Sequence, residues 1–281
     1  MAALSKEDLV RDLKALGVST GDLLCVKVSL RSIGSIDGGA DALIDALLET
    51  IGPSGTLVTD SFVNVYSPLS RAFWAITVDK NTPSYAGALA NTMLKRPNVQ
   101  RSRHPVQKFA LIGSLAERLA IGHTADSYAY DILRIMAEKG AKNLKIGADE
   151  KVPGVNTTHV AIGLAKLRQK RALVGVRYID ESGKRKIFYL NWSGGCMKAF
   201  YNLNRFYDGI PGAVLGKGHI GSAPAKLTSM SVTLKAELEL TRTDTESFLT
   251  CSDPGCIDCR FSWENYQKPL LPFIFSELRK G

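Results

Sequence analysis

The sequence predicts an α/β fold with a partly parallel sheet, and two observations support this class. The first is the order strand, glycine-containing turn, helix, strand between residues 23 and 59, which is typical of a βαβ unit. The second is the composition of the 281 residues, of which 45% are hydrophobic and 22% charged, as in ordinary globular proteins. Because we find no internal repeat or clear linker, we expect one domain over residues 1–281.

Apolar periodicity, glycines and prolines place the elements of the N-terminal half. They predict helices over residues 4–16, 40–51, 84–95, 113–120 and 131–139, and strands over residues 23–30, 56–59 and 143–147. Residues 60–83 are irregular and aromatic, which predicts a long loop that wraps an active site. In the C-terminal half we expect a β-hairpin near residues 172–191 and a final strand near residues 231–240.

His159 lies where a strand-exit loop is predicted to become a helix. Asn156, Thr157 and Thr158 precede it with oxygens that can cap a helix start. Such neighbours fix an imidazole ring, and its ordinary pKa suits proton transfer near pH 7. The spacing is thus compatible with two interpretations of His159: a general base, or a loop histidine that hydrogen-bonds a threonine.

Basic and small residues after the first predicted strand suit an anionic ligand. Ligands of α/β sheets bind beyond the carboxyl ends of strands, the position of Ser29, Arg31, Ser32 and Gly34. Arg101 and Arg103 offer two further guanidinium groups that can contact phosphates. A plain structural turn and a solvated loop are the alternatives for these two segments.

The formal net charge of +9 favours acidic partners. The basic residues form small groups without interleaved aromatics, so we expect an anionic small molecule and not a nucleic acid. The amphipathic start resembles no signal peptide and no apolar run reaches membrane-spanning length. We therefore expect a soluble, cytoplasmic protein with no membrane partner.

The C-terminal part contains a cysteine pattern typical of zinc sites. Cys251, Cys256 and Cys259 lie close together, with the last two in CxxC spacing, and the chain has five cysteines in all. Cys196 is the best candidate for a fourth ligand, with His219 and His123 as alternatives. The segment 251–259 therefore predicts a structural zinc site, or else a cysteine-rich surface loop.

Three stretches together resemble the aminoglycoside 3-N-acetyltransferase-like family. They run from Val28 to Val58, from Pro83 to Leu119 and from Lys142 to Ala161, and the second contains the RSxHP motif at residues 101–105. The resemblance implies a three-layer α/β/α fold with a central mixed sheet, acyl-CoA as co-substrate and N-acyl transfer. It places the family's histidine on His159 and implies a cofactor site that includes the residues Ser29, Leu30, Arg31, Ser32, Gly34, Ser84, Arg101, Ser102 and Arg103.

One departure from the family pattern concerns the acceptor. The family carries a glutamate three residues after the histidine, where this chain has Ile162. We expect Asp149 or Glu150 to replace that carboxylate, and Thr158 to lie with them beside the substrate. Because an aminoglycoside is polycationic and the chain is basic, the sequence favours an amino sugar linked to dTDP or UDP.

Two alternatives to this acceptor remain. One is an aminoglycoside 3-N-acetyltransferase that confers resistance, and the other is a zinc-containing nucleic-acid-binding protein. The βαβ order and the RSxHP motif argue against the second alternative. In each enzymatic hypothesis we expect a homodimer.

Overall fold

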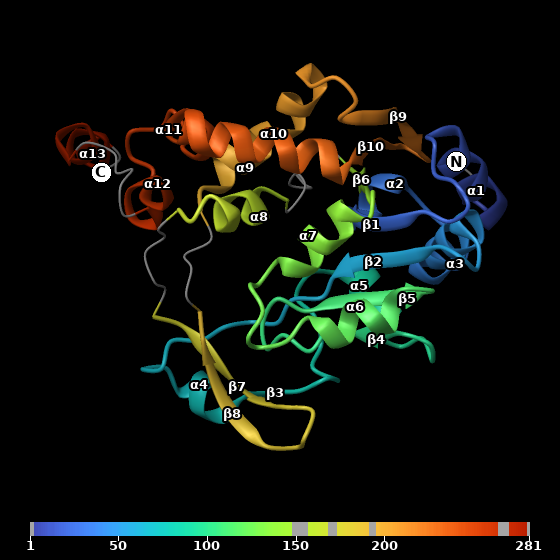
Figure 1. Ribbon diagram of the computed structural model, residues 1–281, viewed down its shortest axis with the longest axis horizontal. Helices are drawn as coiled ribbons and strands as arrows, with labels where there is room; N and C mark the ends of the chain where they lie inside the picture. Colours follow the sequence, from blue (N-terminus) through green and yellow to red (C-terminus); the bar gives the residue numbers. More distant parts are fainter. Residues whose placement is uncertain (1–2, 148–156, 168–172, 191–194, 264–269, 280–281) are drawn as a thin grey trace.

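The computed structural model describes residues 3–147, 157–167, 173–190, 195–263 and 270–279 (Figure 1). Its strands are β1 Leu23–Val28, β2 Thr56–Asp60, β3 Thr77–Val78, β4 Gln100–Arg101, β5 Phe109–Gly113, β6 Lys142–Ile146, β7 Gly175–Ile179, β8 Arg185–Tyr189, β9 Val214–Ile220 and β10 Ala223–Ser229. Its helices are α1 Lys6–Ala15, α2 Leu30–Ile33, α3 Gly39–Ile51, α4 Arg71–Ala75, α5 Ala88–Met93, α6 Ala116–Gly122, α7 Asp131–Glu138, α8 Thr157–Leu164, α9 Met197–Phe206, the 3-10 helix η1 Tyr207–Gly209, α10 Met230–Thr243, α11 Thr245–Leu249, α12 Ile257–Ser262 and α13 Leu270–Leu278.

The main sheet has seven strands in the order β4-β5-β2-β1-β6-β10-β9. The central strand β1 pairs in parallel with β2 and with β6, and the outer pairs are antiparallel. The register aligns Leu24 of β1 with Leu57 of β2 and with Lys142 of β6. The βαβ prediction is therefore confirmed, and the sheet is mixed as the family resemblance implied.

Alternation along β1 divides the core between the two faces of the sheet. Leu24 and Val26 belong to the cluster with α1, α3 and α5, whereas Leu23 and Cys25 belong to the cluster with α6, α7, α8, α9 and α10. A helical layer thus covers each face, which confirms the three-layer α/β/α fold.

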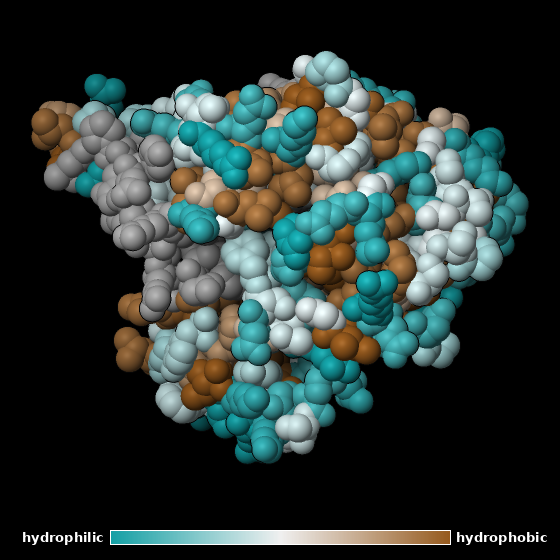
Figure 2. Space-filling model, in the orientation of Figure 1, coloured by the Kyte–Doolittle hydropathy of each residue, from teal (hydrophilic) through white to brown (hydrophobic). Residues whose placement is uncertain are grey.

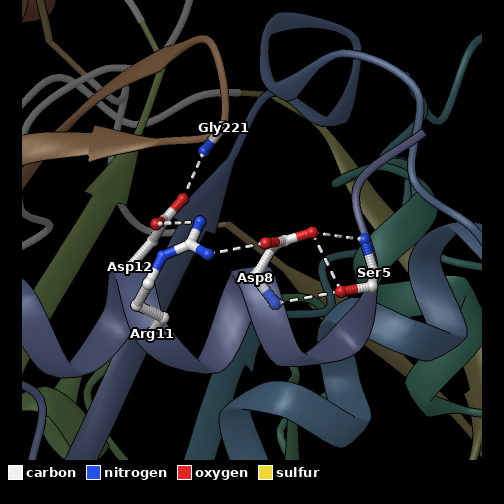
Figure 3. Close-up of polar contacts among 5 residues, drawn as sticks. All are labelled: Ser5, Asp8, Arg11, Asp12 and Gly221. Carbon is white, nitrogen blue, oxygen red and sulfur yellow. Dashed lines mark hydrogen bonds and ion pairs between the residues drawn. The ribbon is translucent and has the colours of Figure 1, made fainter. Parts of the chain in front are cut away.

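The first helix begins with a capping box (Figure 3). The Ser5 hydroxyl accepts from the Asp8 amide at 3.1 Å, and the Asp8 carboxylate accepts from the Ser5 amide at 3.1 Å. Further along the helix, Asp12 accepts from the amide of Gly221 at 3.0 Å. This bond fastens α1 to the turn between β9 and β10, at the β9 edge of the main sheet.

A small second sheet in the order β3-β7-β8 projects from the main one (Figure 1). Strands β7 and β8 pair antiparallel, which confirms the hairpin prediction within residues 173–190. The buried ring of Phe73 in α4 stacks on Tyr189 at 6.1 Å between ring centroids. The aromatic segment 60–83 therefore packs largely on the hairpin.

The prediction of a strand over residues 231–240 is wrong, because these residues lie in α10. Apolar residues alternate there, as in a strand, yet the buried side chains are Met230, Thr233, Glu237 and Thr241, which lie three to four apart. Hydroxyl bonds to backbone carbonyls satisfy the two threonines. The sheet edge is instead formed by the hairpin β9–β10, which the sequence pattern did not indicate.

None of the described helices combines the length and apolar character that crossing a membrane requires. Hydrophobic side chains nevertheless reach the surface at one end of the molecule, where α13 lies (Figure 2). Leu271, Phe275 and Leu278 are each more than half exposed there.

Candidate active site

A cleft of about 510 Å³ opens at the carboxyl end of β1, where α/β sheets bind ligands. Its walls are the end of β1, the segment 29–31, the end of β2 and the residues that lead into α5. Lys27 and Asp60 form an ion pair at 3.6 Å in this cleft, with side chains only 9% and 14% exposed. The cleft therefore holds charges of both signs in a largely desolvated wall.

Of the predicted cofactor residues, Ser29, Leu30 and Arg31 line this cleft. Arg31 is exposed and has no ion pair among the described residues, so its guanidinium is available to an anion. Ser32 donates to the Ser29 hydroxyl at 2.8 Å and stabilises the turn. Gly34 follows with φ of 102°, a conformation that favours glycine.

His159 lies at the third residue of α8, confirming the predicted placement at a helix start. Its ring stacks on Tyr130 at 4.3 Å between centroids and meets the edge of Phe200 at 5.1 Å. The hydroxyl of Tyr128 donates to the His159 carbonyl at 2.7 Å. Three aromatic residues thus fix both the ring and the backbone of His159.

Phe62 and Lys27, which line the cleft, relate His159 to the cavity, Phe62 through packing and Lys27 through its charge. Phe62 lines the cleft and packs edge-on against Tyr130 at 6.2 Å, so it stands one ring away from the imidazole. Burial lowers the pKa of His159 to about 3, and the positive charge of Lys27 lowers it further. The imidazole is therefore neutral at pH 7, and neither ring nitrogen has a hydrogen-bond partner among the described residues.

The sequence analysis missed Glu237, the carboxylate that the structure brings to this helix. It is fully buried on α10 and accepts from the Thr158 hydroxyl at 2.6 Å and from the Tyr207 hydroxyl. Burial raises its pKa to about 7, although the hydroxyl donors oppose that rise. Misplacing residues 231–240 in a strand concealed this residue, and no sequence motif marks it.

The same contact turns Thr158 toward the core. Its side chain is 1% exposed and its hydroxyl donates to Glu237. Contact of Thr158 with a substrate stays a prediction. Asp149 and Glu150, the predicted partners of His159, lie outside the described residues. Ile162, which replaces the family's glutamate, is 2% exposed within the core.

The RSxHP segment mainly stabilises loops of the protein itself. The Arg101 guanidinium donates to the carbonyls of Lys80, Thr82 and Ser61 at 2.5 to 3.0 Å, and burial lowers its pKa to about 10. Ser102 is 1% exposed and accepts from the Phe109 amide at 2.9 Å. Both side chains thus bond to backbone groups of the protein itself, and their contact with a cofactor stays a prediction.

Ser84 and Arg103 differ in their surroundings. The Ser84 hydroxyl is buried and donates to the Phe62 carbonyl at 3.0 Å, which fixes the cleft wall without facing the cavity. Contact of Ser84 with a cofactor stays a prediction. Arg103 lies at a second cavity of about 570 Å³ beside the hairpin, where it faces Glu181 at 3.7 Å. Contact of Arg103 with a cofactor remains a prediction.

The four cysteines of the predicted metal site lie together. The Sγ atoms of Cys196, Cys251, Cys256 and Cys259 are all within 4.8 Å of one another. His123 is elsewhere, buried with its ring nitrogens near the Ser102 hydroxyl and the Ala129 carbonyl. His219 is exposed on β9. Of the candidates for the fourth ligand, Cys196 is therefore the one beside the other three cysteines.

The chain is similar to known proteins at the levels of family and sequence. The family model described as aminoglycoside 3-N-acetyltransferase matches residues 25–240. Aminoglycoside N(3)-acetyltransferase III from Salmonella sp is 29% identical over 185 residues, which cover 59% of this chain and 63% of that protein. Aminoglycoside N(3)-acetyltransferase VIII from Streptomyces fradiae is 29% identical over 193 residues, which cover 63% of this chain and 67% of that protein. The match thus spans less than two thirds of the first of these relatives.

Solved structures show the same fold. AAC-VIa bound to sisomicin superposes with a TM-score of 0.75 and 26% identity, covering 86% of this chain and 99% of that one. AAC-IIIb in a binary complex with CoASH has a TM-score of 0.76 at 23% identity, and the match covers 89% of this chain and 100% of that one. The second likeness bears on the fold alone.

These relatives overturn the prediction of a nucleotide-linked amino sugar as acceptor, because they are described as aminoglycoside acetyltransferases. That prediction depended on Ile162 and on the net charge. Ile162 points into the core, so its identity does not report on the acceptor. The net charge is distributed over the surface and gives no measure of the charge inside the cleft.

Proposed function

The chain belongs to the aminoglycoside 3-N-acetyltransferase family, and we propose that it transfers an acyl group from acyl-CoA to an amino group of an aminoglycoside. The observation that carries this proposal is the family match over residues 25–240, which contains both the cleft and His159. The AAC-VIa structure with sisomicin supports the class of acceptor, since its fold is shared over 86% of this chain.

In the proposed reaction, the amine nitrogen attacks the thioester carbonyl, a C–N bond forms and the C–S bond breaks. CoA leaves as the thiol after the amine proton has moved to it through the base. His159 is our candidate for this base, because the neutral imidazole has a lone pair at pH 7. Its packing against Tyr130 and Phe200 fixes the ring before substrate binds.

The cleft at the end of β1 supports binding of two oppositely charged ligands. Arg31 and Lys27 suit the phosphates of CoA, and Asp60 suits an ammonium group of the acceptor. A volume of about 510 Å³ is within the usual range for small-molecule sites. We propose this cleft as the shared entrance for cofactor and acceptor.

The test measures acetylated sisomicin by mass spectrometry after incubation of the purified chain with acetyl-CoA. We expect product with the wild type and a loss of kcat of about 10² to 10⁴-fold in His159→Ala, the usual contribution of a general base. His219→Ala is the matched control, because His219 is exposed on β9, and it should retain activity.

Two outcomes would separate the parts of the proposal. Absence of product with any acyl-CoA and any aminoglycoside would refute the activity. Product formation at an undiminished rate in a folded His159→Ala protein would refute the role of His159 and leave the activity intact. We further propose that residues 1–281 act as one domain and as a homodimer, which calorimetry and light scattering would test.

A further inference from the structure

Four cysteines from two segments of the chain, residue 196 and residues 251–259, meet behind the candidate active site. Cys196 directly precedes α9, Cys251 follows α11, Cys256 caps α12 and Cys259 lies in its first turn. Cys196, Cys256 and Cys259 are buried, and Cys251 is partly buried. The fifth cysteine, Cys25, lies apart in β1. The fold therefore collects four of the five thiols at one buried point.

The sulfur spacing fits one tetrahedral ion. The Sγ atoms of Cys196 and Cys256 are 3.7 Å apart, as are those of Cys251 and Cys259, and all four lie within 4.8 Å. Zinc–thiolate bonds of about 2.3 Å in a tetrahedron give sulfur separations of about 3.8 Å. A disulfide needs about 2.05 Å between sulfurs, and a cluster with several irons would hold its four thiolates further apart.

We propose that Cys196, Cys251, Cys256 and Cys259 bind one structural zinc ion. Four thiolates complete a tetrahedral set, so no position is left for water or substrate. Zinc is favoured over magnesium or calcium, because those ions prefer oxygen ligands. The proposed zinc site is inferred from these four cysteines alone, so it does not depend on the proposed acyl transfer.

The surrounding chain is shaped for such a site. The Cys251 amide donates to the Cys259 sulfur at 3.3 Å, a type of contact that commonly supports metal thiolates. The turn before Cys256 is closed by its amide, which donates to the Asp253 carbonyl at 3.2 Å. Lys198 of α9 pairs with Asp253 at 2.7 Å, which links the two cysteine-bearing segments a second time.

The ion would connect the C-terminal segment that carries α12 to Phe200, the aromatic residue that packs against His159. Phe200 lies one helical turn after Cys196 and contacts the His159 ring at 5.1 Å. Trp263, directly after α12, is buried in the same cluster as Phe200. Gly195 lies against both rings, since a Cβ there would stand 2.7 Å from Phe200 and 3.6 Å from Trp263. Zinc binding therefore fixes α9 and α12 together behind His159.

The first measurement is the metal content of the full chain, purified without chelator under reducing conditions, by elemental analysis and native mass spectrometry. We expect one zinc per chain. Replacement by cobalt(II) should give the intense thiolate-to-cobalt absorption and the visible bands of a tetrahedral sulfur site. Chelation should lower Tm by at least about 5 °C, since the ion binds only the folded chain.

Variants locate the site. Cys256→Ala should lose the zinc, whereas Cys25→Ala, a buried cysteine outside the cluster, should keep one equivalent. If Cys256→Ala does not fold, the cobalt spectrum of the wild type still decides the matter. No bound metal after zinc reconstitution, a cobalt spectrum without thiolate absorption, or iron as the resident ion would overturn the proposal.

Discussion

Replacing Glu237 with glutamine should change how the stability of the protein depends on pH. Glu237 is fully buried, and one carboxylate oxygen accepts from Thr158 and Tyr207 while Oε2 has no partner among the described residues. Glutamine keeps an oxygen for both hydroxyls and carries no ionisable proton. The variant therefore removes the titration while it preserves the shape of the side chain.

The size of the effect on the free energy of unfolding follows from the raised pKa of Glu237. Burial raises the pKa of Glu237 to about 7 from an ordinary 4.5, and each pKa unit corresponds to about 1.4 kcal/mol, so the full effect is about 3 kcal/mol. Below pH 4.5 both the folded and unfolded states hold the proton, and the effect is absent. As the pH rises toward 7 only the unfolded state releases it, so the free energy of unfolding falls.

The assay is urea unfolding of the wild type and of Glu237→Gln between pH 5 and 8. The variant should gain about 2 to 3 kcal/mol relative to the wild type over this range. Buried histidines with lowered pKa values contribute equally to both proteins and cancel in the difference. Glu239→Gln, with an exposed side chain on the same helix, is the matched control and should show no such trend. A constant difference between Glu237→Gln and wild type would refute the raised pKa.

Three further predictions concern the cap, the core and the histidines. Ser5→Ala removes the capping box of α1 and should lower the free energy of unfolding by about 1 kcal/mol in urea, whereas an unchanged midpoint would contradict the bonds of Figure 3. Leu47→Ala, at a fully buried position of α3, should lower the free energy of unfolding by about 2 to 5 kcal/mol, and Leu48→Ala, at a partly exposed position, should lower it less. Burial lowers the pKa of His159 to about 3, so its NMR signals, assigned with His159→Gln, should stay those of neutral imidazole from pH 8 to 5; a midpoint near 6.5 would show that the ring is solvated.

Much of the N-terminal half follows from the sequence because its signals are local. Residues 23–59 carry the strand, helix and strand of the βαβ unit, with apolar faces of the right period and a glycine at each break. The placement of His159 at a helix start likewise follows from the threonines before it. The CxxC spacing likewise predicted that Cys256 and Cys259 lie together, since they are the N-cap and the first turn of α12.

Tertiary structure alone decided which groups meet across the fold. Glu237 reaches Thr158 from 79 residues away. The alternating apolar pattern around it favours a strand, yet the segment forms α10 and packs against α8. Arg101 and Ser102 resemble ligand-binding residues in the sequence. In the structure Arg101 donates to backbone carbonyls and Ser102 accepts from a backbone amide. Such buried backbone groups are costly without a partner, so these two side chains stabilise the fold. The sequence by itself thus determined the local elements and the residue types of the site. Burial and distant hydrogen bonds, which no local pattern contains, decided which of those residues remain available to a ligand.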